Sequence, residues 1–96
     1  MPVLPQPLTV LLAEDDDLCA AAWSTVLGLK GCDVVHAPNG AIALALARDR
    51  CPVILVTDWM MPEVDGLSLC LAFRVDPTLR CVPIVFMSSL PPDHGG

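Results

Sequence analysis

The segment Pro52–Thr57 constrains the fold more than any other part of the chain. It reads PVILVT, a run of apolar and β-branched residues with no alternation of polar and apolar side chains. Such a run is typical of a strand buried on both faces of a parallel sheet. Because parallel strands need long crossover connections, usually helices, the run predicts an α/β fold.

Strand-like and helix-like segments alternate along the rest of the chain. Strands are predicted at residues 9–13, 33–36, 53–57 and 82–87, with Pro38–Gly40 as a turn. Helices are predicted after the acidic run 14–17, at 41–50 and at 66–75, where Asp76-Pro77 stops the last one. The first helix, with Asp16 or Asp17 as its N-cap and Gly28 or Gly31 near its end, has apolar residues at helical spacing. These are Leu18, Ala21, Ala22, Val26 and Leu29.

Two of the predicted strands run directly into acidic residues. The strand 9–13 is followed by Glu14-Asp15-Asp16-Asp17, and the strand 53–57 is followed by Asp58. The carboxyl ends of strands form the rim where open α/β sheets bind ligands. If the two strands are neighbours, Glu14, Asp15 and Asp58 share one anionic site. A hard cation such as Mg²⁺ would relieve the repulsion among their carboxylates. An aspartate beside Mg²⁺ can act as a nucleophile toward a phosphoryl donor.

Composition narrows the function classes. Ninety-six residues make one small domain, and a net charge of −6 disfavours nonspecific binding of nucleic acid. No apolar run reaches the roughly 20 residues of a membrane helix, so we expect no membrane span. The five cysteines are widely spaced and contain no C-x-x-C pair, which favours apolar core residues in a reducing compartment and hence a cytoplasmic location. His36 and His94 lack partners at metal-ligand spacing and are expected to be solvated.

Several motifs, in order, resemble the receiver (phosphoacceptor) domain of two-component response regulators. They are VLLAEDD at 10–16, Asn39-Gly40, VTDWMMP at 56–62, Asp65-Gly66 and VPIVFMSS at 82–89. Each motif alone is weak, but together and in this order they are highly specific.

The resemblance implies a flavodoxin-like (CheY-like) parallel sheet with strand order 2-1-3-4. It implies that Asp58 accepts the phosphoryl group and that the Ser88 hydroxyl senses it. It also implies a Mg²⁺ site made of Glu14, Asp15, Asp58 and the backbone carbonyl of Met60. The phosphoryl donor would be a sensor histidine kinase or a histidine phosphotransfer protein.

The chain departs from the family pattern at its end. Family members continue after the fourth strand with a helix, a strand and a helix, and their fifth strand brings a lysine to the phosphoryl group. This sequence stops at Gly96, and its only lysine is Lys30. We therefore expect a truncated receiver at 9–90, a flexible Pro-rich arm at 1–8 and a flexible tail at 91–96. An apolar fourth strand left at the sheet edge predicts self-association through that edge.

Three functions remain open at this point. The first is a receiver that accepts a phosphoryl group on Asp58 with Mg²⁺ and acts through protein contacts, without being an enzyme in the ordinary sense. The second is a degenerate receiver that serves as a dimerisation or docking module without phosphorylation. The third is a small metal-dependent phosphatase with an aspartate nucleophile. Such enzymes usually carry a second aspartate two residues later, and this chain has Met60 there.

Overall fold

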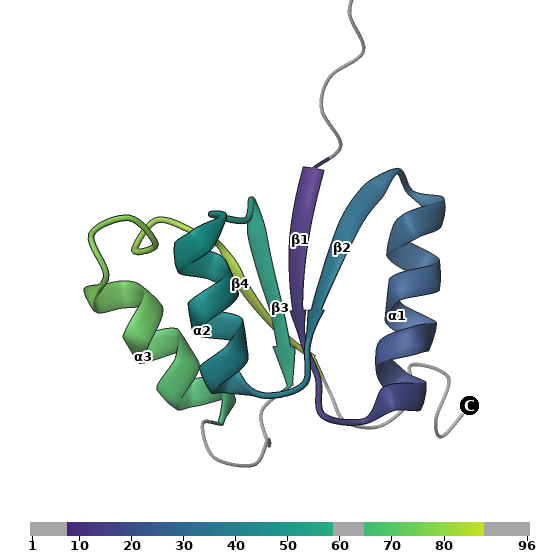
Figure 1. Ribbon diagram of the computed structural model, residues 1–96, viewed down its shortest axis with the longest axis horizontal. Coiled ribbons are helices and arrows are strands. Elements are labelled where there is room, and N and C mark those ends of the chain that lie inside the picture. Colours follow the sequence, from purple (N-terminus) through teal and green to yellow (C-terminus); the bar gives the residue numbers. More distant parts are fainter. Residues whose placement is uncertain (1–7, 59–64, 88–96) are drawn as a thin grey trace, which may run out of the picture.

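The computed structural model describes residues 8–58 and 65–87. Its four strands are β1 (Leu8–Ala13), β2 (Cys32–Ala37), β3 (Ile54–Asp58) and β4 (Ile84–Met87). All pairings are parallel and the order is β2-β1-β3-β4, as the resemblance implies. The helices are α1 (Asp17–Leu29), α2 (Gly40–Asp49) and α3 (Gly66–Val75). Figure 1 shows α1 on one side of the sheet and α2 and α3 on the other.

Pairing register brings the carboxyl ends of the central strands to the same edge of the sheet. Ala13, the last residue of β1, pairs with Ala37 on β2 and with Thr57 on β3. Asp58 pairs one step further along with Met87 on β4. The residues that follow β1 and the last residue of β3 therefore lie beside one another at this edge.

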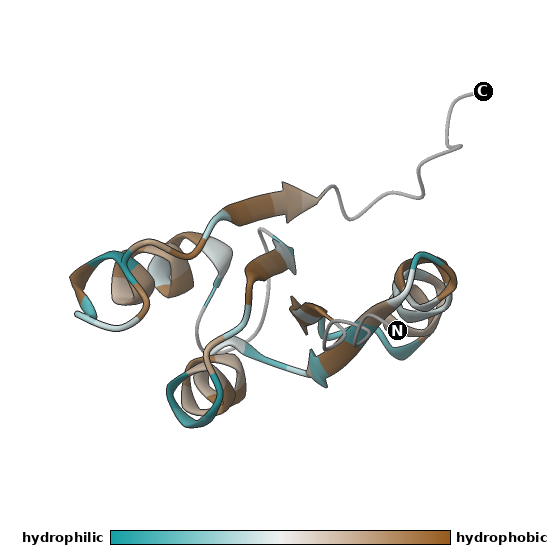
Figure 2. Ribbon diagram, turned by 90° about the horizontal axis from the view of Figure 1, so that it is seen from above, coloured by the Kyte–Doolittle hydropathy of each residue, from teal (hydrophilic) through white to brown (hydrophobic). Residues whose placement is uncertain are grey.

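The sheet has a hydrophobic layer on each face, because successive strand residues point to opposite sides. Leu11 and Leu55 pack against α2 and α3, where Phe73 is fully buried. Val10, Leu12 and Val56 lie on the face covered by α1. Figure 2 shows the resulting arrangement, with mainly hydrophobic strands between the two helical layers.

The apolar face predicted for α1 is wrong. Leu18 and Leu29 are 83% and 82% exposed, and the helix packs instead through Ala20, Trp23 and Leu27. The reason is that α1 is apolar on nearly every side, so spacing alone does not identify the side that meets the sheet.

The ends of the helices follow from local capping chemistry. The Asp16 side chain caps α1 by accepting from the N–H groups of Leu18 (2.9 Å) and Cys19 (3.2 Å). Gly31, just past the C-cap, has φ +88°, a conformation that favours glycine. Asn39 is the N-cap of α2, so the predicted turn at residues 38–40 already includes the first residue of that helix.

The remaining predicted boundaries differ by only a few residues. Helix α3 at residues 66–75 is confirmed. The strand predicted at 82–87 begins at Ile84, although the carbonyl of Pro83 still accepts a hydrogen bond from the N–H of Leu55 at 2.9 Å. None of the helices in the described residues is long and apolar enough to cross a membrane.

The prediction that the cysteines are core residues is wrong for Cys51 and Cys81, whereas Cys32 packs against the core. Cys51 and Cys81 are exposed, the other three cysteines are half-buried, and all five are free thiols. Cys51 and Cys81 lie in the connections that lead into β3 and β4, where the chain is still at the surface. Four expectations lie outside the described residues. They concern residues 1–7 of the arm, Met60, Ser88 and the tail at 91–96.

Candidate metal and phosphoryl site

Glu14 is held at the rim of the sheet by an extension of the β1–β2 ladder. Its backbone N–H donates to the carbonyl of Ala37 at 3.0 Å. Its side chain is only 3% exposed. One carboxylate oxygen, Oε1, accepts a hydrogen bond from the N–H of Asp16 at 3.1 Å. Glu14 is therefore a fixed acid rather than a solvated one.

The four consecutive acids divide into two roles. Glu14 and Asp15 have carboxylates in the site, and Asp15 is exposed. Asp16 caps α1. Asp17 occupies the first turn of this helix, where its negative charge interacts favourably with the positive end of the helix dipole. The run is therefore more than a solvated helix terminus.

Asp58 ends β3 and is 3% exposed. Its Oδ1 atom is buried and has no hydrogen-bond partner among the described residues. A buried carboxylate oxygen without a partner is costly, so this atom calls for a proton or a cation.

Gly66 lets α3 begin directly against Asp58. A Cβ atom built at Gly66 would collide with the backbone carbonyl oxygen of Asp58 and would also press on the Phe86 ring. Only glycine allows this approach. The N-terminus of α3 therefore contributes to the fixed position of the phosphoacceptor candidate.

The three acids predicted to share a site do so. Carboxylate oxygens of Glu14, Asp15 and Asp58 lie within 4.8 Å of one another. Burial raises the pKa of Glu14 from 4.5 to about 7, and the nearby charge of Asp58 adds to this effect. The N–H group of Asp16 acts in the opposite direction.

This donor set fits a hard divalent cation. Carboxylate oxygens are the ligands that Mg²⁺ prefers, and Mg²⁺ usually keeps waters for exchange with phosphoryl oxygens. A cation would also satisfy the orphaned Oδ1 of Asp58 and offset the repulsion that adds to the effect of burial on the pKa of Glu14. The chemistry of the site therefore favours a magnesium centre.

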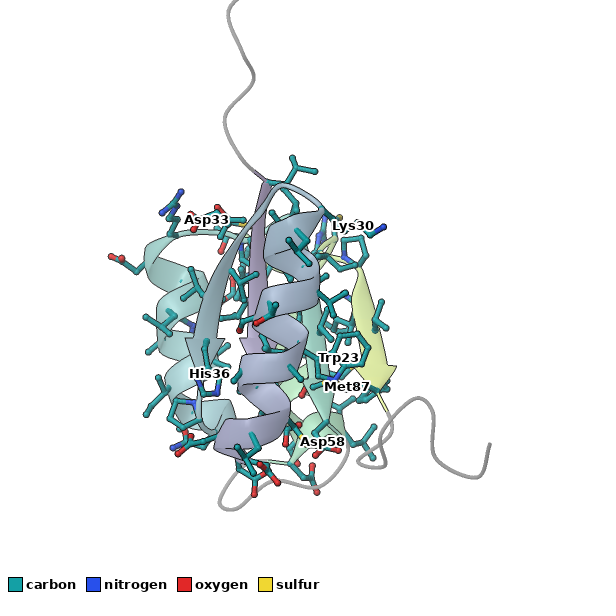
Figure 3. The ribbon with its side chains drawn as sticks, turned by 90° about the vertical axis from the view of Figure 1, so that its right-hand side faces the viewer. Trp23, Lys30, Asp33, His36, Asp58 and Met87 are labelled. Atoms are coloured by element: carbon teal, nitrogen blue, oxygen red, sulfur yellow. The ribbon has the colours of Figure 1, made fainter. Side chains whose placement is uncertain are left out.

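Other candidate residues have different outcomes. The predicted roles of Ser88 and of the Met60 carbonyl stay predictions, because both residues lie outside the described ranges. Lys30 lies at the end of α1 opposite the acidic site, far from Asp58 (Figure 3).

His36 was missed by sequence reasoning, which expected it to be solvated. It is half-buried, and its Nε2 atom lies 2.7 Å from the carbonyl oxygen of Glu14. The signal that could have identified it is its place near the end of β2, beside the strand that leads to Glu14.

Comparisons with known proteins agree with this geometry. The response regulator receiver domain family matches residues 10–92. Protein PilG of Pseudomonas aeruginosa is 33% identical over 85% of this chain and 61% of its own length. The polar-differentiation response regulator DivK of Brucella anthropi is 29% identical over 86% of this chain and 68% of its own. The chain thus spans about two thirds of these curated relatives.

Solved structures show the same fold. The receiver domain of the Francisella response regulator 1452 has a TM-score of 0.77 at 32% identity, covering 90% of this chain and 69% of that one. The chemotaxis protein CheY4 of Vibrio cholerae has a TM-score of 0.83 over 92% and 73% of the two chains, and its 24% identity supports the fold alone. The family match, the strand order and the acidic site together show that this chain belongs to the response regulator receiver domain family of two-component signalling.

Proposed function

We propose that this receiver domain accepts a phosphoryl group on Asp58 in a Mg²⁺-dependent reaction and signals through protein contacts. The donor is the phosphohistidine of a sensor histidine kinase or of a histidine phosphotransfer protein, and the setting is the cytoplasm. The chain acts as a signalling domain, not as a metabolic enzyme or a nucleic-acid-binding module. The receiver unit is assigned to residues 9–90, between an arm at 1–8 and a tail at 91–96.

One observation carries the proposal. The buried Oδ1 of Asp58 lacks a partner among the described residues, and it belongs to a carboxylate grouped with those of Glu14 and Asp15. A structural acid at a strand end would be hydrogen-bonded or solvated. A buried carboxylate with an unpaired oxygen beside two other carboxylates instead favours a cation and a phosphoryl ligand.

The residues of the chain perform distinct parts of this chemistry. Asp58 is the nucleophile: its carboxylate oxygen forms a bond to phosphorus while the bond from phosphorus to the donor imidazole nitrogen breaks. The imidazole leaves with that electron pair. Glu14, Asp15 and Asp58 would hold Mg²⁺, which would supply positive charge to neutralise the phosphoryl group. The Ser88 hydroxyl and the Met60 carbonyl complete the proposed site.

The direct test is Mg²⁺ titration by isothermal calorimetry of the parent chain and of Asp58→Asn. We expect about a tenfold or greater loss of affinity in Asp58→Asn, because a charged ligand becomes neutral. Asp33→Asn is the matched control: it removes the same charge from a half-exposed aspartate at the opposite end of the sheet (Figure 3). Equal affinities for the two variants would contradict the assignment of Asp58.

A second candidate function is a docking or dimerisation module that works without phosphorylation. The specific observation in its favour is the position of Lys30, the only lysine in the sequence, which lies away from Asp58. Lys30 is therefore not placed to pair with a phosphoryl group on Asp58. If the parent shows no response to Mg²⁺ and a phosphoryl donor or beryllofluoride, this second function is favoured.

Both candidates include self-association through the edge strand β4. Among the described residues β4 pairs with β3 alone, and Val85 is 46% exposed. We expect a second copy to cover this edge, because unpaired apolar edges are sites of strand pairing. Light scattering should show dimers that Val85→Lys disrupts. Val53→Lys, at an equally exposed valine outside β4 (46%), is the control. A parent that stays monomeric at high concentration would contradict this part of the proposal.

A further inference from the structure

His36 makes a long-range contact that the proposed reaction does not yet use. Its Nε2 atom lies 2.7 Å from the carbonyl oxygen of Glu14, twenty-two residues earlier in the chain. A carbonyl oxygen only accepts hydrogen bonds, so Nε2 must carry the proton and donate. Figure 3 shows His36 near the same end of the sheet as Asp58.

This contact is one of two hydrogen bonds that hold the backbone of Glu14. The N–H of Glu14 donates to the carbonyl of Ala37 at 3.0 Å, and its carbonyl accepts from His36. Both backbone groups of this residue are thus tied to adjacent residues of β2. Glu14 is the first residue beyond β1, where the regular ladder would otherwise cease to hold the chain.

Fixing the Glu14 backbone also orients its carboxylate. The Glu14 Oε1 atom is held by the N–H of Asp16, and the side chain is almost fully buried against Asp58. A change in the peptide plane after Glu14 would alter both the direction of its side chain and the start of the Asp15–Asp16 turn. Groups that orient metal-binding side chains in this way affect affinity without touching the ion.

We propose that His36 is a positioning residue for the magnesium site. It acts through Glu14, by holding the carbonyl of that residue so that the Glu14 and Asp15 carboxylates converge with Asp58. This inference rests on the proposed function, since it assigns a role toward the same cation. It concerns the hydrogen bond that Nε2 donates, and not any change in the charge of the imidazole.

The test is the Mg²⁺ affinity of a set of His36 variants, measured by calorimetry at a temperature where circular dichroism shows each variant to be folded. His36→Val introduces a β-branched side chain, which suits a strand, but it has no donor. His36→Gln places an amide N–H group near the position of Nε2, whereas His36→Asn carries the same amide on a shorter side chain that does not reach. Val34→Ala is the control for packing, because Val34 lies on the same strand and the same face of the sheet.

The expected pattern separates positioning from general stability. Mg²⁺ affinity should fall about fivefold to tenfold in His36→Val and His36→Asn, and stay within about twofold of the parent in His36→Gln. Val34→Ala should lower the unfolding temperature and leave the affinity unchanged. If His36→Val does not fold, the contrast between the Asn and Gln variants carries the test.

Two results would overturn the inference. One is parental affinity in His36→Val or His36→Asn, and the other is equal loss in the Gln and Asn variants. If Asp58→Asn still weakens binding in that case, the proposed function survives and only the role of His36 fails. If the parent chain does not bind Mg²⁺ at all, the proposed function fails first, and the role of His36 fails with it.

Discussion

The buried Glu14 carboxyl makes the stability of the metal-free domain depend on pH in an unusual direction. Its pKa is raised from 4.5 to about 7 in the folded state, chiefly by burial and then by the charge of Asp58. The folded state therefore holds the proton more tightly than the unfolded state. The resulting stability is fully present below about pH 4.5 and is lost as the pH rises through about 7.

The magnitude follows from these two pKa values. Integrating the linkage relation gives a loss of about 2.5 kcal/mol in the free energy of unfolding between about pH 5 and about pH 8. This is a large fraction of the stability of a small domain. Asp65 and Asp76 have lowered pKa values, held by hydrogen bonds from Ser68 and Thr78. Both groups finish titrating below this pH window, so the stability that they contribute stays constant within the window and does not mask the effect.

The assay is urea unfolding without divalent cations at the two pH values, followed by circular dichroism. Glu14→Gln is the comparison variant, because it keeps the size of the side chain and cannot titrate. We expect the parent to lose about 2.5 kcal/mol more than Glu14→Gln over this range. Mg²⁺ should restore stability to the parent more at about pH 8 than at about pH 5, since it binds the ionised carboxylate. An equal pH dependence in the two proteins would refute the reasoning.

Two further predictions compare matched pairs of substitutions by thermal or urea unfolding. Gly66→Ala should lower the free energy of unfolding by about 1–3 kcal/mol or more, because its Cβ meets a backbone carbonyl. Gly28→Ala should be neutral or stabilising, because nothing lies within 4 Å of the added atom. Equal effects of the two substitutions would contradict the close approach of α3 to Asp58. Phe73→Ala should cost about 3–5 kcal/mol, because Phe73 is fully buried, and Leu29→Ala, at a side chain 82% exposed, should change stability by less than about 0.5 kcal/mol. A large loss in Leu29→Ala would mean that this face of α1 is covered in solution.

Sequence reasoning located the site because strand ends are local features with a fixed geometry. The runs before Glu14 and Asp58 identify two strands, and parallel pairing places their carboxyl ends at one rim of the sheet. The strand order itself came from the resemblance to the receiver family, since apolar runs alone do not say which strands are neighbours.

Other features depend on tertiary contacts that a sequence pattern does not contain. The side of α1 that packs on the sheet was mispredicted because Leu18 and Leu29 are as apolar as the residues that are buried. The bond from His36 to Glu14 joins a side chain to a distant backbone carbonyl, and a sequence pattern does not show which side chain reaches such a carbonyl. The exposure of Cys51 and Cys81 was mispredicted for a similar reason, since composition does not show where a connection meets the surface.

Formation of an acyl phosphate on Asp58 tests the central claim most directly. The parent chain and Asp58→Asn would be incubated with acetyl phosphate, with Mg²⁺ or with a chelator, and measured by intact mass spectrometry. We predict the added mass of one phosphoryl group in the parent with Mg²⁺, and none with chelator or in Asp58→Asn. A parent that gains no phosphoryl group, or a variant that gains one equally, would contradict the role assigned to Asp58.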